Sequence, residues 1–177
     1  MTDTSPWKLR PASAIDLCAV NRVIESAIDT WDVPARVKRL SLPLYRYSDH
    51  DLDFLDLVVA EAEGLGIVGV SAWEQADPGD APAGHSALLL HGIYTAPDQH
   101  RKGVGTQLFK AAEKAAASRG LDGVLVKAQP GAGDFFFALG LERVPVEDHR
   151  RDYSHRFWKP VNGASDAAHG ESGRSNH

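Results

Sequence analysis

The stretch that decides the fold of this 177-residue chain is ALLLHGIYTAPDQHRKGVGTQLF, residues 87–109. Residues 87–95 are mostly apolar, which predicts a buried strand. Residues 104–119 carry apolar side chains at the spacing of a helix that packs on a sheet. Between these two elements lies a basic turn with two glycines, Gly103 and Gly105.

The glycine turn predicts an anion site. The first N–H groups of a helix have no partner within the helix, and the helix dipole adds partial positive charge there. Glycines let this backbone approach a phosphate closely, and Arg101 and Lys102 add charge. The turn lacks the third glycine of a dinucleotide-binding loop, and its lysine precedes the glycine, unlike that of a nucleotide-triphosphate loop. We therefore expect a phosphate or pyrophosphate of another class.

A third pattern is carried by Tyr94-Thr-Ala-Pro97 followed by HRKGVG, residues 100–105. It resembles the acyl-CoA-binding signature of the GNAT acetyltransferase superfamily, a strand with V-x-P and then [QR]-x-x-G-x-[GA] opening a helix. The strand-like segment 122–128 and QPGAGDFFFALGL, residues 129–141, resemble the segments that follow in that family. The resemblance implies an α+β fold with a mixed, mostly antiparallel sheet that splays in a central V, flanked by helices. It also implies acetyl-CoA as co-substrate.

The chain departs from the family pattern at five positions. His100 stands where the family has Gln or Arg, and Thr95 replaces Val. Gln129 replaces Asn, and Leu141 replaces the final Phe. Phe136 occupies the position of the tyrosine often assigned as the general acid, which puts the identity of that acid in doubt.

The resemblance also implies a co-substrate site. The backbone around 93–95 would hold the pantetheine arm, and residues 101–106 would hold the pyrophosphate. A solvated basic turn is the alternative for the latter. The expected set is Ile93, Tyr94, Thr95, His100, Arg101, Lys102, Gly103, Val104, Gly105, Thr106, Gln129 and Phe136.

His91 is the candidate general base, because histidine exchanges a proton near neutral pH. By resemblance, its strand position often carries Glu in the family, and His in aralkylamine-type members. The alternative is a partly buried histidine satisfied by hydrogen bonds in the sheet. Tyr153 and His155 lie near a late strand and are secondary candidates for the acid, each with a structural alternative. His85 and His91 have no supporting ligands, so no metal is expected.

Composition sets further expectations. The formal net charge of −5 gives no support for nucleic-acid binding. No apolar run approaches a membrane span, and the N-terminus lacks a signal peptide, so a cytoplasmic location is expected. Cys18 is the single cysteine, which excludes an intramolecular disulfide, and its helical spacing predicts a structural role. Length predicts one domain over 1–161, with a small, polar, disordered tail at 162–177.

The rest of the chain yields a coarse map. A helix is expected from Ser13 to about Trp31, a helical or irregular region over 34–43, and a hairpin of 57–63 with 67–73. A loop follows at 76–86, and one or two closing strands are expected within 143–160. Gly92 inside a strand indicates a bulge.

Two functions follow from these observations. The first is an N-acetyltransferase that moves an acetyl group from acetyl-CoA directly to a primary amine of a small molecule. The second, motivated by Phe136, is a catalytically degenerate acyl-CoA-binding or regulatory module. An aromatic wall and nearby acids would suit a cationic acceptor, although these residues could equally pack or lie in a solvated loop; they are Trp31, Tyr45, Tyr47, Asp49, Asp51, Asp53 and Asp56. The resemblance makes a homodimer possible.

Overall fold

The structure is a computed structural model that describes residues 5–161. The tail expected at 162–177 lies outside the described residues, so the domain boundary at 161 stays a prediction. The helices are α1 (Leu17–Asp29), α2 (Ala35–Tyr45), α3 (Val104–Ser118) and α4 (Gly133–Ala138), with 3₁₀ turns at Ala14–Asp16, Asp51–Asp53 and Pro97–Gln99. The strands are β1 (Trp7–Pro11), β2 (Asp56–Ala62), β3 (Gly66–Gln75), β4 (Ala87–Thr95), β5 (Gly123–Lys127), β6 (Glu142–Arg143) and β7 (Arg156–Pro160).

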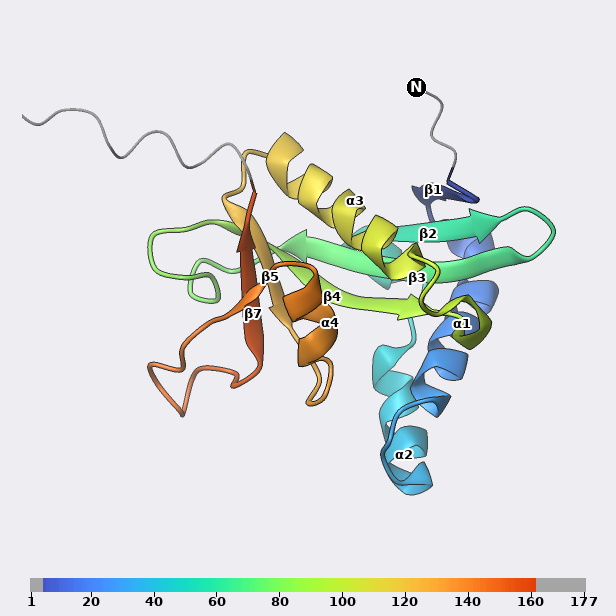
Figure 1. Cartoon of the computed structure of the whole chain (residues 1–177), viewed down its shortest axis with the longest axis horizontal. Coiled ribbons are helices and arrows are strands. Elements are labelled where there is room, and N and C mark those ends of the chain that lie inside the picture. Colours follow the sequence, from blue (N-terminus) through green and yellow to red (C-terminus); the bar gives the residue numbers. More distant parts are fainter. Residues whose placement is uncertain (1–4, 162–177) are drawn as a thin grey trace, which may run out of the picture.

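The seven strands form one sheet in the order β1-β2-β3-β4-β5-β7-β6 (Figure 1). Every neighbouring pair is antiparallel except β4 and β5, which are parallel because α3 connects them as a crossover. The expected α+β fold with a mostly antiparallel sheet is confirmed.

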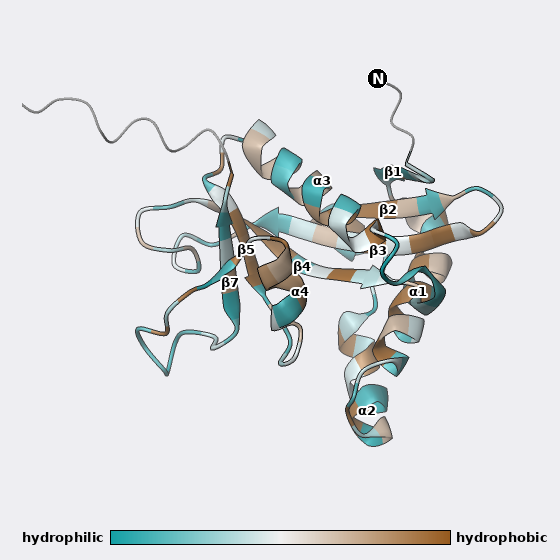
Figure 2. Cartoon of the chain, viewed as in Figure 1, coloured by the Kyte–Doolittle hydropathy of each residue, from teal (hydrophilic) through white to brown (hydrophobic). Residues whose placement is uncertain are grey.

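Helices cover both faces of the sheet, and β2 shows how the sequence arranges this. Successive side chains of a strand point to opposite faces. Val59 accordingly packs with α1, whereas Ala60 packs with Val104 and Leu108 of α3. Strand β5 is hydrophobic along most of its length, as Figure 2 shows, because both of its faces are buried.

The bulge expected at Gly92 is present in β4. Ala72 of β3 lies opposite Gly92, but the next residue, Trp73, lies opposite Leu90. His91 is thus the extra residue, without a register partner on β3. A bulge of this kind bends the strand and re-aims its side chain.

The central splay begins at the same place. Strand β4 pairs with β5 only from Ala87 to Leu90, where Leu90 lies opposite Val126. Beyond that point β4 stays paired with β3 as far as Thr95 and parts from β5 (Figure 1). The edge of β4 from residue 91 to 95 therefore faces an opening instead of a neighbouring strand.

Two expectations about the helices need correction. The chain after Ser13 first forms a 3₁₀ turn, and α1 begins at Leu17. Its buried side is made by Val20, Val23, Ile24, Ala27 and Ile28, so Cys18 is exposed instead of lying on an apolar interface.

The sequence interpretation also missed Phe109 of α3, which is one of the largest fully buried side chains. Within residues 5–161, no helix is both long and apolar enough to cross a membrane.

Candidate active site

A cavity of about 1000 Å³ lies at the splay of the sheet. It is bounded by the turn after α1, the end of α2, the second half of β4, the start of α3, the end of β5 and the start of α4. Every residue expected to bind the co-substrate lines this cavity except Lys102. The sequence therefore predicted the walls of one continuous site.

The turn before α3 forms one end of the cavity and has the features expected of an anion site. Gly103 is the residue before the helix and has a φ of 96°, a left-handed conformation that glycine adopts without a steric penalty. Arg101 also has a positive φ of 61° and lines the cavity. Nε2 of His100 lies 3.1 Å from the carbonyl oxygen of Thr95, which ties the turn back to β4. The free N–H groups of the helix start and the Arg101 charge suit a phosphate.

Gly92 and Tyr94 are packed against each other where β4 leaves β5. A Cβ atom on Gly92 would lie 2.8–3.0 Å from ring and hydroxyl atoms of Tyr94, so only glycine leaves room for this ring. Burial raises the pKa of the Tyr94 hydroxyl, with smaller contributions from Tyr47 and Tyr45. The Tyr94 hydroxyl therefore stays protonated at neutral pH beside the bulge.

Aromatic side chains form the wall at the other end of the cavity. The Trp31 and Tyr45 rings meet edge to face with centroids 5.4 Å apart, and those of Tyr45 and Tyr94 lie 6.4 Å apart. Nε2 of Gln129 donates a hydrogen bond to the Tyr45 hydroxyl. Asp32 supplies a carboxylate at this end. The aromatic wall combines an apolar surface with the π-faces that attract cations.

The expected acidic border is not part of this wall. None of Asp49, Asp51, Asp53 or Asp56 lines the cavity. Asp51 accepts hydrogen bonds from Ser48, and Asp56 forms an ion pair with Arg119 at 2.5 Å. Tyr47 packs beside α1 instead of lining the cavity. These residues follow the structural alternatives that the sequence left open.

His91 lines the cavity at the bulge, with 34% of its side chain exposed. Its Nε2 lies 2.7 Å from Oε1 of Glu74 on β3. The side chain is therefore accessible to a substrate, and it is not a histidine enclosed by the sheet. Its role as the base stays a prediction.

Phe136 takes the position of the family tyrosine and carries no hydroxyl there. It is 5% exposed, stacks on Phe157 with centroids 5.9 Å apart, and lines the cavity beside Phe135. Phe136 thus belongs to both the core and the cavity wall. Phe137 lies outside the lining and is half exposed.

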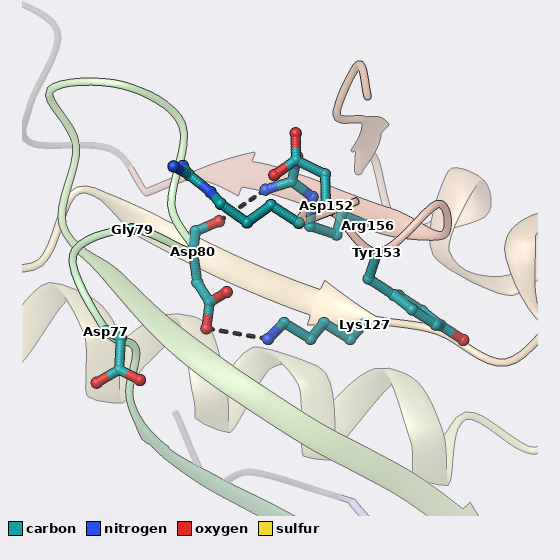
Figure 3. Close-up of a pocket in the computed structure, with 8 residues that line it drawn as sticks. Asp77, Gly79, Asp80, Lys127, Asp152, Tyr153 and Arg156 are labelled. Carbon is teal, nitrogen blue, oxygen red and sulfur yellow. Dashed lines mark hydrogen bonds and ion pairs between the residues drawn. The ribbon is translucent and has the colours of Figure 1, made fainter. Parts of the chain in front are cut away.

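Tyr153 and His155 are not brought to the cavity that holds His91. The Tyr153 hydroxyl donates to the carbonyl of Ala128 at 3.0 Å, and its ring meets that of His155 edge to face. Tyr153 lines a second cavity of about 380 Å³, to which Lys127 also contributes (Figure 3). Its hydroxyl nevertheless meets Ala128, which lines the large cavity, so the acid role of Tyr153 stays a prediction, as does that of His155.

An ion-pair network forms the second cavity. Nζ of Lys127 lies 2.9 Å from Asp80, and Arg156 lies 3.3 Å from Asp152 and donates to the Asp80 carbonyl (Figure 3). The network ties the 76–86 loop to the segment before β7. Lys127 lines both cavities. Neither Lys127 nor Glu74 was singled out from the sequence, because only strand pairing places Glu74 beside His91 and Lys127 at the cavity.

Metal-binding residues do not gather in the described part of the chain. Among residues 5–161, no three His, Cys, Asp or Glu side chains lie together as a metal site.

The sequence comparison identifies the family. A family model described as the acetyltransferase (GNAT) family matches residues 21–141. This chain belongs to the GNAT acetyltransferase family. No curated protein matches it.

Solved GNAT structures share the fold over most of the chain. PaiA N-acetyltransferase from Thermoplasma acidophilum, in complex with coenzyme A, has a TM-score of 0.70 and 14% identity over 87% of this chain and 98% of its own. A GCN5-related N-acetyltransferase from Rhodopseudomonas palustris has a TM-score of 0.66 and 21% identity, over 91% of this chain and 99% of its own. A GNAT acetyltransferase from Brucella melitensis, in complex with acetyl-CoA, has a TM-score of 0.56 and 18% identity, over 77% of this chain and 82% of its own. Acetyl-CoA is the co-substrate of this family.

Proposed function

We propose that this GNAT protein transfers an acetyl group from acetyl-CoA directly to a primary amine of a small molecule. The observation that carries the proposal is a single cavity that joins the anion-binding start of α3 to an accessible histidine at the splay of β4 and β5. The first feature suits the pyrophosphate of the donor. The second lies where a thioester and an amine would meet.

Acetyl-CoA fits the donor end of the cavity. The turn at 100–106 would hold the pyrophosphate through backbone N–H groups and Arg101. The pantetheine arm would lie along residues 93–95, where β4 has no neighbouring strand on the β5 side and can offer its peptide groups to the arm's amides. The complexes of the T. acidophilum and B. melitensis proteins with coenzyme A and acetyl-CoA support this assignment.

The transfer needs an acceptor for each of two protons and one leaving group. His91 takes a proton from the ammonium form of the acceptor, and the neutral amine attacks the thioester carbonyl carbon. The tetrahedral intermediate releases a further N–H proton to water and expels the sulfur as a thiolate, so the products are an acetamide and coenzyme A, and His91 returns its proton to solvent. Backbone N–H groups at the bulge would stabilise the negative oxygen of the intermediate.

The acceptor end suits an organic cation. Trp31, Tyr45 and Tyr94 offer aromatic surface, and Asp32 adds a negative charge. These groups support a small amine with an apolar body. The shared fold does not identify the acceptor, because neighbours with this fold also include the AtaT toxin bound to the C-terminus of its antitoxin and acetyl-CoA.

The degenerate binding module is the second candidate, and Phe136 is the observation that favours it. The missing tyrosine need not abolish turnover, because a thiol with a pKa near ~8.5 leaves as a thiolate without a proton. We therefore favour the active enzyme.

A panel of amines tests the proposal. Purified protein is incubated with acetyl-CoA and each amine, released thiol is followed, and the acetylated amine is identified by mass spectrometry. We expect turnover with at least one small apolar amine, and a loss of about 100-fold in kcat for His91→Ala. His85→Ala is the matched control, because His85 also lies beside a carboxylate, that of Asp122, and does not line the cavity. No turnover with any amine by a protein that binds acetyl-CoA would favour the degenerate module.

Direct transfer has its own readout. Cys18 is exposed on α1 and does not line the cavity. Cys18→Ala should keep turnover within a few-fold of wild type, and no acetyl adduct should appear on the protein.

The cytoplasmic location and the homodimer stay predictions.

A further inference from the structure

Glu74 is held against His91 by the register of β3 and β4. Glu74 lies opposite Leu89, and the bulge adds His91 two residues further along β4. This places Oε1 of Glu74 2.7 Å from Nε2 of His91, with 39% and 34% of the two side chains exposed. The sequence separation of 17 residues gives no sign of this contact.

The contact distinguishes the two nitrogens of the imidazole. A neutral imidazole carries one N–H, and an ionised carboxylate can only accept a hydrogen bond. The ring must therefore place its hydrogen on Nε2 to satisfy Glu74. This leaves the lone pair of Nδ1 as the only basic site of the neutral ring.

We propose that Glu74 is a positioning residue for acetyl transfer, which fixes His91 as the Nε2–H tautomer so that Nδ1 takes the proton from the amine. The proposal rests on the proposed function. When Nδ1 gains the proton, the carboxylate of Glu74 stabilises the positive imidazolium, as an opposite charge within hydrogen-bond distance does. Nε2 keeps its own proton throughout.

Other charged groups at the cavity do not compete for this role. Asp32, Tyr45, Tyr94, His100, Arg101 and Lys127 are the other titratable residues that line it. Lys127, the cation on the neighbouring strand, is already paired with Asp80 at 2.9 Å. Over residues 5–161, Glu74 is the only carboxylate in an ion pair with His91.

A purely structural role predicts little effect from removing the carboxylate. An ion pair between side chains this exposed contributes little to stability. Glu74→Gln should therefore fold, and its melting temperature should stay close to that of wild type. A catalytic effect in a stable variant then belongs to the histidine.

The kinetic test compares Glu74→Gln with Glu61→Gln. Glu61 is a matched control, because it is a half-exposed glutamate of the same sheet and its ion-pair partner, Arg10, does not line the cavity. We expect Glu74→Gln to lower kcat/KM for the amine about tenfold or more. Affinity for acetyl-CoA should not change. In a His91→Ala background, Glu74→Gln should cause no further loss.

A second measurement does not need turnover. Ring-nitrogen NMR of the labelled protein, with the His91 signals assigned by comparison with His91→Gln, reports the tautomer at pH 8. We expect the Nε2–H form in wild type and Glu61→Gln, and a mixture in Glu74→Gln. An Nδ1–H tautomer in wild type, or a kcat/KM for the amine that is equal in Glu74→Gln and wild type, would overturn the proposal. A protein with the expected tautomer and no turnover would instead contradict the proposed function alone.

Discussion

At the scale of single residues, the cavity differs from the family pattern at one chemically important position. Phe136 presents a ring where a hydroxyl is usual, and it is fixed by stacking on Phe157. A phenyl ring cannot donate a proton, so the thiolate must leave without one or take one from another group. The two other candidates for the acid, Tyr153 and His155, lie outside the cavity.

Phe136→Tyr measures how much the missing acid matters. We expect kcat to change by less than about threefold, because a thiolate of this basicity leaves unaided. Turnover of the best amine at saturating acetyl-CoA is the measurement. Phe137→Tyr is the matched control, since this neighbour lies outside the cavity lining and is 49% exposed. Strong activation by Phe136→Tyr alone, from a wild type without turnover, would show that the natural protein is a degenerate module.

The residue types at the donor end could be predicted because their roles are local. A glycine with positive φ, a basic turn and a helix start all follow one another in the chain. Glu74 could not be predicted, because it reaches His91 only through the pairing of β3 with β4. The place of Lys127 in the cavity wall likewise depends on the arrangement of the sheet. The structural role predicted for Cys18 was wrong for a related reason. The chain after Ser13 forms a 3₁₀ turn before α1, and both Ile15 and Cys18 are exposed, outside the buried side of the helix.

At the scale of elements, the bulge in β4 connects the fold to the site. Without the extra residue, β4 would have no local disruption where it parts from β5. Gly92 and Tyr94 maintain the geometry together, because the Tyr94 ring occupies the space that a Cβ of residue 92 would need.

A double-mutant cycle tests this packing. Gly92→Ala should lower the free energy of unfolding by about 1–3 kcal/mol, since the Tyr94 ring must move. In a Tyr94→Ala background the same change should cost much less, which gives a coupling energy of about 1–3 kcal/mol. Urea unfolding followed by circular dichroism supplies the four values.

Gly79→Ala is the control for this cycle, because a Cβ there meets no atom within 4 Å. It should leave stability nearly unchanged. Equal costs of Gly92→Ala with and without the Tyr94 ring would show that the glycine is required for another reason.

At the scale of the whole molecule, one ion-pair cluster joins the edge of the sheet to the start of α1. The Arg10 guanidinium donates to both oxygens of Asp16 at 2.8–2.9 Å and to Glu61 at 2.9 Å. These hydrogen bonds from Arg10 hold the pKa of the Asp16 carboxyl well below its usual range, and a bond from the Ser13 N–H adds to the effect.

The lowered pKa of Asp16 makes the free energy of unfolding depend on pH in the acidic range. A carboxyl with a folded pKa below its unfolded value of about 3.9 contributes its full stabilisation above that pH. The contribution is lost as the pH falls from about 5 toward the folded pKa. Asp16→Asn should therefore destabilise by about 1–3 kcal/mol at pH 7 and progressively less in acid.

Urea unfolding between pH 7 and pH 3 checks this dependence. Glu25→Gln is the control, because its ion pair with Arg46 is half exposed on both sides and should contribute about 0–1 kcal/mol. A cost of Asp16→Asn that stays constant down to pH 3 would contradict the assignment of the acid sensitivity to this carboxyl.

The central claim is that the turn before α3 holds the phosphates of acetyl-CoA, and a calorimetric titration tests it most directly. Wild type should bind acetyl-CoA at one site. Arg101→Glu should weaken binding about 10- to 100-fold, the value of a charge-assisted contact, because Arg101 lines the cavity. Lys102→Glu should stay within about threefold, because this neighbour of equal charge does not line it. No binding by wild type, or equal losses in both variants, would contradict the account.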